Sequence, residues 1–200
     1  MEKTVKHTRE NTDGNIKIVL FGPESTGKTT LAEQLAKHYK TLWVPEFMRE
    51  YLEKKWATKK QSISKEDLLP IAKGQWEQEE YALKKVDNLL ICDTNLLELK
   101  VYSEYYYNGF CPEFIEKRAV QDSNSFYLLT YIDTPWEKDI LRDRPHNREE
   151  MFSIFEAELK KQGFPYQILK GNLEERFKKA TEIIDELLKN RNFDRFTDLP

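Results

Sequence analysis

The sequence predicts a three-layer α/β domain in which a five-stranded, mainly parallel sheet has helices on both faces. Three observations lead to this fold class. Five short apolar runs alternate with longer segments whose apolar residues recur at helical spacing. The length of 200 residues suits a single domain, and no internal repeat interrupts the alternation. A glycine-rich turn follows the first run, at the edge of the sheet where such folds bind ligands.

Each expected strand is an apolar run bounded by turn or polar residues. The first run, IKIVLF, ends at Gly22, and Pro45 stops the second. The third, LLICD, ends in Asp93, and the fourth is FYLLTYI. A Gly-Phe-Pro turn precedes the fifth. The expected strands are residues 16–21, 42–44, 89–93, 126–132 and 166–169.

The expected helices combine apolar spacing with residues typical of helix ends. Leu31 and Leu35 share one face of the first helix. A capping box at Ser64 begins the third, Gly109 ends the fourth, and Pro112 opens the fifth. The expected helices are residues 28–39, 46–56, 64–85, 96–107, 112–120, 151–162 and 173–190, with a polar linker at 57–62.

Composition narrows the classes of function. The chain has 32 Lys+Arg and 35 Asp+Glu, and this net charge of −3 argues against a general nucleic-acid-binding surface. No apolar run has membrane-span length, and the two cysteines and three scattered histidines lack metal-site spacing. We expect a cytoplasmic protein without membrane insertion: a flexible polar lead at 1–15, one domain at 16–190 and a tail at 191–200. The sequence does not indicate an oligomeric state.

The turn after the first strand matches a phosphate-binding loop. Residues 22–29, GPESTGKT, fit G-x-x-x-x-G-K-[ST] between a strand and a helix. Backbone N–H groups of such a loop and the helix dipole bind phosphates, while Lys28 reaches the β- and γ-phosphates and Thr29 ligates Mg²⁺. This P-loop predicts a P-loop NTPase fold; the alternative is a simple glycine-rich turn. The expected nucleotide-binding residues are Gly22, Glu24, Ser25, Thr26, Gly27, Lys28, Thr29 and Thr30.

Asp93, at the end of the third strand, fits the Mg²⁺-side aspartate of a P-loop site, so Thr29 and Asp93 are the expected metal ligands. A turn or cap role is the alternative for Asp93. Thr94 follows where motor-type ATPases carry an acid, which disfavours a hydrolytic machine. No N-K-x-D string is present to read guanine. ATP and Mg²⁺ are therefore the expected cofactors.

Two further groups of charged residues suit a kinase of a small molecule. Glu46 follows the second strand and would accept the proton of an acceptor hydroxyl or hydrogen-bond a ribose, while Arg49 would neutralise the transferring phosphoryl group. The alternative is a helix-end acid in a salt bridge with Arg49. Arg142 and Arg148 lie in a polar stretch around Pro145 that predicts an Arg-rich lid at about 136–150. A solvated helix end is the alternative there.

Aromatic residues and one charged pair give weaker signals. The four tryptophans could stack on a flat ring, but core packing is the commoner role for each. The tyrosines at 102, 105, 106 and 107 are expected to pack with their hydroxyls in water. Lys100 and Glu104, four residues apart on a helix, are expected at the surface.

Several motifs, in order, resemble the ribosylnicotinamide kinase domain of the NadR type, a P-loop kinase branch often labelled an AAA-type ATP-binding domain. The matching strings are GPESTGKT (22–29), EFMREY (46–51), AKGQ (72–75), DT (93–94) followed by Tyr107 and Gly109, and D-T-P-W-x-x-D-x-L-R (133–142). The resemblance covers residues 16–190. It implies phosphorylation of the 5′-hydroxyl of nicotinamide riboside by ATP, giving nicotinamide mononucleotide.

The chain also departs from this family. It lacks the H-x-G-H motif of the adenylyltransferase domain often fused to it, so we expect activity to end at the mononucleotide. Ile140 stands where the lid often has glycine, and stand-alone members vary in substrate, so another vitamin or nucleoside acceptor stays open. A second hypothesis is a regulatory protein that senses ATP or GTP and transfers nothing.

Overall fold

The computed structural model describes residues 14–122, 124–136 and 147–197. Within them five strands form one sheet in the order β2-β3-β1-β4-β5, and all neighbouring strands are parallel. The strands are β1 (Ile16–Phe21), β2 (Trp43–Val44), β3 (Leu89–Asp93), β4 (Ser125–Thr130) and β5 (Tyr166–Leu169). The five-stranded parallel sheet is confirmed, although β2 is shorter than expected and β4 ends at Thr130 rather than 132.

Seven helices join these strands in the described chain. They are α1 (Lys28–Tyr39), α2 (Phe47–Lys59), α3 (Lys65–Leu83), α4 (Leu96–Tyr106), α5 (Glu113–Ala119), α6 (Arg148–Gln162) and α7 (Leu173–Thr197). The capping box predicted at Ser64 is formed with Asp67. The predicted linker at 57–62 is shorter, because α2 continues to Lys59 and ends where Lys60 adopts a left-handed conformation.

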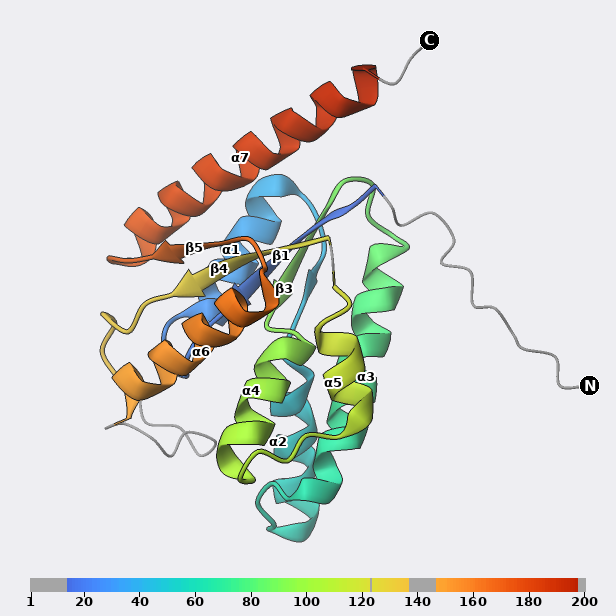
Figure 1. Cartoon of the computed structure of the whole chain (residues 1–200), viewed down its shortest axis with the longest axis vertical. Coiled ribbons are helices and arrows are strands. Elements are labelled where there is room, and N and C mark those ends of the chain that lie inside the picture. The colour runs from blue at the N-terminus through green and yellow to red at the C-terminus, as the bar shows by residue number, and fades with distance from the viewer. Residues whose placement is uncertain (1–13, 123, 137–146, 198–200) are drawn as a thin grey trace, which may run out of the picture.

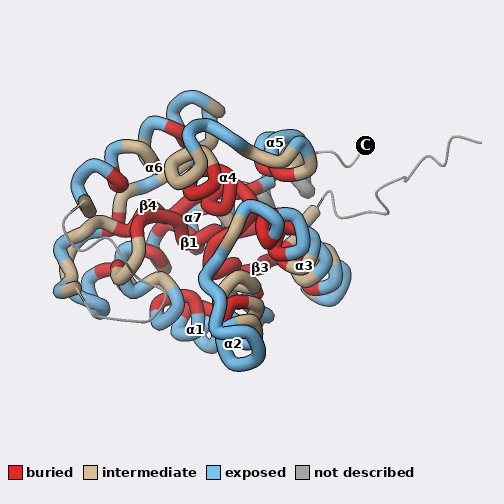
Figure 2. The backbone as a smooth tube through the Cα atoms, turned by 90° about the horizontal axis from the view of Figure 1, so that it is seen from below, coloured by how far each residue is buried: buried red, intermediate tan, exposed pale blue. Residues whose placement is uncertain are grey.

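The sheet separates two layers of helices (Figure 1). On one face, Ile18 and Leu20 of β1 pack with buried residues of α1 and α7. On the other, Val19 and Phe21 pack with buried residues of α2 to α6. Alternate residues of one strand thus enter opposite cores, as the period of a strand requires. Figure 2 shows the buried backbone concentrated along the strands and on the helix faces turned toward them.

The two ends of the described chain differ from the sequence prediction. α7 was expected to end at 190 but continues to Thr197, so the prediction of a tail from 191 is wrong for most of that segment. Residues 173–197 contain neither glycine nor proline, so no residue type breaks the helix. At the other end, Asn15 was assigned to the flexible lead, but its side-chain amide donates to the carbonyls of Leu83 (3.1 Å) and Val86 (2.9 Å). Residues 1–13 and 137–146, the rest of the lead and most of the predicted lid, lie outside the described residues.

The strand order brings the carboxyl ends of β1 and β3 side by side. β1 lies between β3 and β4, and in register Leu20 of β1 is opposite Asp93 of β3. Helix α1 connects β1 to β2, which lies on one side of β1 together with β3. Strands β4 and β5 extend the sheet on the other side. Ligands of such sheets bind at this reversal, beyond the carboxyl ends of the strands. None of the helices in the described ranges has the length and apolar character needed to cross a bilayer.

Candidate active site

The loop between β1 and α1 has the backbone conformation of an anion cradle. Gly22, Ser25 and Gly27 have φ of 134°, 58° and 79°. A Cβ at Gly22 would lie 2.9 Å from the carbonyl oxygen of Thr130, so both the torsion and the close approach of β4 require glycine. Gly27 is the N-cap of α1, and in the described chain no side chain caps this helix. The first N–H groups of α1 are therefore available to an anion.

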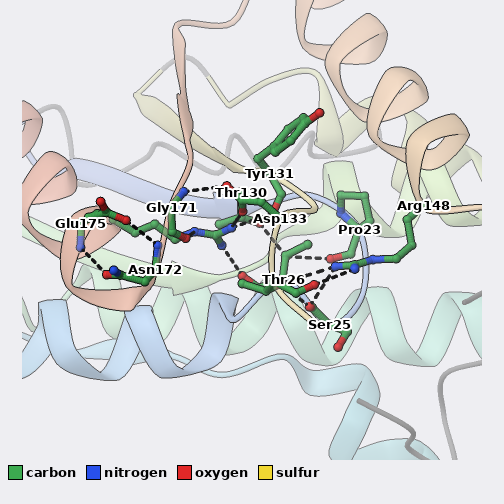
Figure 3. A network of polar contacts seen from close by, with 12 residues as sticks. Pro23, Ser25, Thr26, Thr130, Tyr131, Asp133, Arg148, Gly171, Asn172 and Glu175 are labelled. Atoms are coloured by element: carbon green, nitrogen blue, oxygen red, sulfur yellow. Dashed lines mark hydrogen bonds and ion pairs between the residues drawn. The ribbon is translucent and has the colours of Figure 1, made fainter. Parts of the chain in front are cut away.

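Two arginines bond to carbonyls of the loop, and Figure 3 shows Arg148 beside Ser25. Arg148 donates to the carbonyl of Ser25 (3.2 Å), and Arg176, only 2% exposed, donates to the carbonyl of Thr26. Arg176 is itself fixed by an ion pair with Asp133. In a trans peptide the N–H points away from the preceding carbonyl, so the amides of Thr26 and Gly27 point toward the opposite side of the loop.

A cavity of ≈ 340 Å³ lies in front of the loop. It brings together residues that the sequence placed in separate motifs. From the P-loop come Glu24, Ser25, Thr26, Gly27, Lys28, Thr29 and Thr30; from the other elements come Glu46, Met48, Arg49, Asp93, Glu98, Tyr102, Thr134 and Pro135. Of the predicted P-loop residues, all but Gly22 thus share one cavity with Glu46, Arg49 and Asp93.

The residues expected to bind metal are in contact. The Thr29 hydroxyl donates to Asp93 Oδ2 at 2.6 Å, and Asp93 Oδ1 is buried with no hydrogen-bond partner among the described residues. Burial raises the pKa of Asp93, although Thr29, Lys28 and Arg49 oppose the shift. A hydroxyl and a carboxylate are the oxygen ligands that Mg²⁺ prefers, and the free oxygen offers a coordination position. The pair therefore fits a Mg²⁺ ion shared with phosphates.

Lys28 is held at the mouth of the loop. Its Nζ donates to the carbonyls of Gly22 (2.6 Å) and Pro23 (3.0 Å). It also forms an ion pair with Glu98 Oε1 at 3.3 Å. All these partners compete with a phosphate for the same ammonium group.

Glu46 and Arg49 reach the cavity from the start of α2. Glu46 is the extended N-cap residue of α2, and Arg49 forms an i,i+4 ion pair with Glu53 at 3.8 Å. The next residue after Glu46, Phe47, donates its backbone N–H to the Gln75 side chain (2.9 Å). A Cβ on Gly74 would lie 2.2 Å from the Phe47 ring. The AKGQ string thus fixes the start of α2 through close packing and one hydrogen bond.

The predicted lid arginines have different outcomes. Arg142 lies outside the described residues. Arg148, the first residue of α6, donates to the carbonyl of Thr134 (2.7 Å) as well as to Ser25, so it contacts the back of the P-loop. The DTPW string carries Thr134, whose hydroxyl donates to the Ser25 carbonyl at 2.8 Å. A role of either arginine toward a phosphoryl group stays a prediction.

Sequence reasoning missed Glu98 and Tyr102, which lie one turn apart on α4 and line the cavity. Glu98 is 4% exposed, and burial raises its pKa to about 8. Tyr102 was expected to keep its hydroxyl in water, but that hydroxyl is buried and has no hydrogen-bond partner in the described chain. The available signal was position, because α4 starts directly after Asp93 and its first turns must border the same edge of the sheet.

Comparison with protein families gives one match that covers most of the chain. The family described as "AAA domain" matches residues 17–176. Two similar curated proteins are the trifunctional NAD biosynthesis/regulator proteins NadR of Salmonella typhimurium and Escherichia coli. Each is 23% identical over 176 residues, which are 86% of this chain and 42% of the relative. The chain therefore spans less than half the length of these relatives, and the resemblance inferred from the motifs is confirmed.

Solved structures show the same fold. A NadR protein in complex with NR superimposes with a TM-score of 0.68 at 19% identity, covering 87% of this chain and 51% of the other. A deoxyadenosine kinase from M. mycoides gives a TM-score of 0.62 at 16% identity, covering 86% and 100%. A parallel five-stranded sheet with helices on both faces is thus the P-loop kinase fold in this chain.

Proposed function

The chain belongs to this AAA domain family, and from that premise we propose that it is a Mg²⁺–ATP-dependent kinase whose acceptor is a small nucleoside, preferably nicotinamide riboside. One observation carries the proposal. Glu46 and Arg49 line the same cavity as Lys28, Thr29 and Asp93. An acid opposite the phosphate loop is what transfer to a hydroxyl requires. The NadR relatives and the neighbour solved with NR support the riboside as acceptor.

At the donor end, the P-loop amides and Lys28 would bind the β- and γ-phosphates. Thr29 and Asp93 would hold Mg²⁺, which when bound supplies positive charge to the phosphate oxygens. Arg148 and Arg176 bond the carbonyls of Ser25 and Thr26 and so brace the backbone of the loop. This end of the site contributes positioning and charge.

At the acceptor end, Glu46 would orient the 5′-hydroxyl and accept its proton as the oxygen attacks the γ-phosphorus, while the bond from that phosphorus to the β,γ-bridging oxygen breaks and ADP leaves. Arg49 would offset the negative charge of the transferring group. Because Phe47 ties this segment to Gln75 of α3, the carboxyl of Glu46 is presented from a fixed helix start. A fixed orientation of the reacting groups lowers the barrier to transfer, because less freedom is lost when the two substrates meet.

The test is coupled ADP release with Mg²⁺–ATP. Nicotinamide riboside is compared with thiamine, the ribonucleosides, the deoxyribonucleosides and a blank without acceptor. Release that depends on nicotinamide riboside supports both the reaction and the acceptor. Release with another acceptor keeps the kinase and replaces its substrate. Release in the blank alone indicates an ATPase, and bound nucleotide without any release indicates a sensor.

A further inference from the structure

Glu98 is a buried carboxyl that forms an ion pair with the P-loop lysine. The ion pair joins Lys28 Nζ to Glu98 Oε1 at 3.3 Å, with side chains 10% and 5% exposed. The second oxygen, Oε2, is buried and lacks a hydrogen-bond partner among the described residues. A buried carboxylate without a cation or donors is strongly disfavoured, so Lys28 is what stabilises the charged form of Glu98 here.

Nucleotide binding removes that support. The phosphates of a bound nucleotide draw the P-loop lysine toward themselves. Lys28 cannot contact phosphates and remain equally paired with Glu98, because its ammonium group has three donors and now uses them on Glu98 and two loop carbonyls. Glu98 and the phosphates therefore compete for one cation, and binding of nucleotide leaves both oxygens of Glu98 in need of a donor.

Tyr102 lies one turn further along α4 and faces the same space. Its hydroxyl also lacks a hydrogen-bond partner in the described ranges, although the residue is only 8% exposed. Burial, and then the carboxyls of Glu98, Glu24 and Glu46, raise the pKa of Tyr102, so these three acids lie within electrostatic range of its hydroxyl. A smaller hollow continues from this wall between α2, α3 and α4, and it too is lined by Glu46, Glu98 and Tyr102. The two unpartnered groups thus border the acceptor side of the cavity.

We propose that Glu98 couples the two substrates: it pairs with Lys28 in the nucleotide-free protein, and once the phosphates take Lys28 it binds, together with Tyr102, a hydroxyl-bearing part of the acceptor. Nucleotide and acceptor then bind synergistically, since each satisfies a group that the other leaves unpaired. The acceptor part rests on the proposed kinase function, whereas the competition for Lys28 does not.

The first test measures nucleotide binding alone. Kd for Mg²⁺–AMP-PNP is determined by calorimetry at pH 8.5 for the wild type, Glu98→Gln and the control Glu104→Gln on the same helix. Glu98→Gln removes the competing charge, so it binds the analogue about five- to tenfold more tightly, while the control matches the wild type. Damage to the fold would weaken binding, so a tighter Kd separates this role from a structural one. Equal or weaker binding by Glu98→Gln overturns the proposal whatever the acceptor is.

The second test measures the coupling. Kd for nicotinamide riboside is determined with and without saturating Mg²⁺–AMP-PNP. The wild type binds it about tenfold more tightly with the analogue present, and Glu98→Gln loses this gain. Tyr102→Phe keeps the wild-type Kd for the analogue and weakens the riboside several-fold. A wild type that turns over the riboside but binds it equally well in both states overturns the coupling and leaves the kinase intact. A third outcome is that the riboside is neither bound nor turned over while Glu98→Gln still binds the analogue more tightly. That result excludes the riboside as the acceptor and supports the competition for Lys28.

Discussion

The donor end of the cavity is built from one continuous segment, whereas the acceptor end is assembled from several helices. Residues 24–30 supply most of the donor end, and the half-buried Arg148 and the buried Arg176 bond the carbonyls of Ser25 and Thr26. The acceptor end takes Glu46 and Arg49 from the start of α2 and Glu98 and Tyr102 from α4. Asp93 at the donor end and Glu98 and Tyr102 at the acceptor end each keep one buried oxygen without a hydrogen-bond partner among the described residues. The donor end is thus built locally, with two loop carbonyls already bonded, whereas the acceptor end depends on how α2 and α4 are packed relative to each other.

The largest effect is expected from a substitution at the donor end, at Lys28. Lys28→Ala removes the cation that the phosphates need, so we expect kcat to fall by about a thousandfold or more. At pH 7 the melting temperature should stay close to that of the wild type, because Lys28 lies outside the core clusters and Glu98, whose pKa burial raises to about 8, can stay neutral when it loses this partner. Coupled ADP release and a thermal melt check this. Native turnover in a variant with a native melt would exclude the P-loop role.

The acceptor end is tested at Glu46. If Glu46 accepts the proton of the acceptor hydroxyl, Glu46→Gln lowers kcat by at least about a hundredfold and leaves Kd for Mg²⁺–AMP-PNP unchanged. The matched control is Glu50→Gln, an exposed acid one turn further along α2. Steady-state kinetics separate the two roles considered for this residue. A rise in KM with kcat preserved would assign Glu46 to binding of the ribose.

The difference between the two ends also decides what a sequence can predict. The P-loop and Asp93 could be picked out of the sequence because both patterns depend on local spacing beside a strand. Lys100 shows the limit: its pairing with Glu104 was expected from spacing, but the lysine is buried because α6 brings Glu158 to 2.8 Å. Glu98 and Tyr102 were missed for the same reason. Their role depends on which elements pack against α4, and no local pattern specifies that packing.

A substitution at Gly74 tests whether the packing of α3 against α2 affects the acceptor end without affecting the donor end. A Cβ there would lie 2.2 Å from the Phe47 ring, so Gly74→Ala should shift the start of α2. We expect KM for the acceptor to rise about five- to tenfold, Kd for the nucleotide to stay constant and the free energy of unfolding to fall by about 1–3 kcal/mol. Gly109→Ala is the control, because its φ of +82° is unfavourable for alanine while its Cβ meets no described atom within 4 Å. Equal changes of KM in both variants would indicate general loosening of the fold.

The last effect is a gradual change of stability with pH, and it concerns Glu98, the buried acid of the acceptor end. Burial raises the pKa of Glu98 from 4.5 to about 8. Between these values the unfolded chain has lost this proton and the folded chain keeps it, so the free energy of unfolding falls as pH rises, by at most about 1.4 kcal/mol per pH unit. Glu98→Gln lacks this contribution, so its stability relative to the wild type should increase steadily from pH 5 to pH 8 in urea titrations. Parallel curves for the two proteins would mean that Glu98 ionises at its ordinary pKa. A steepening difference would mean that the fold tolerates a carboxyl that is stable only when neutral or paired, which is the state expected of a group kept for a ligand.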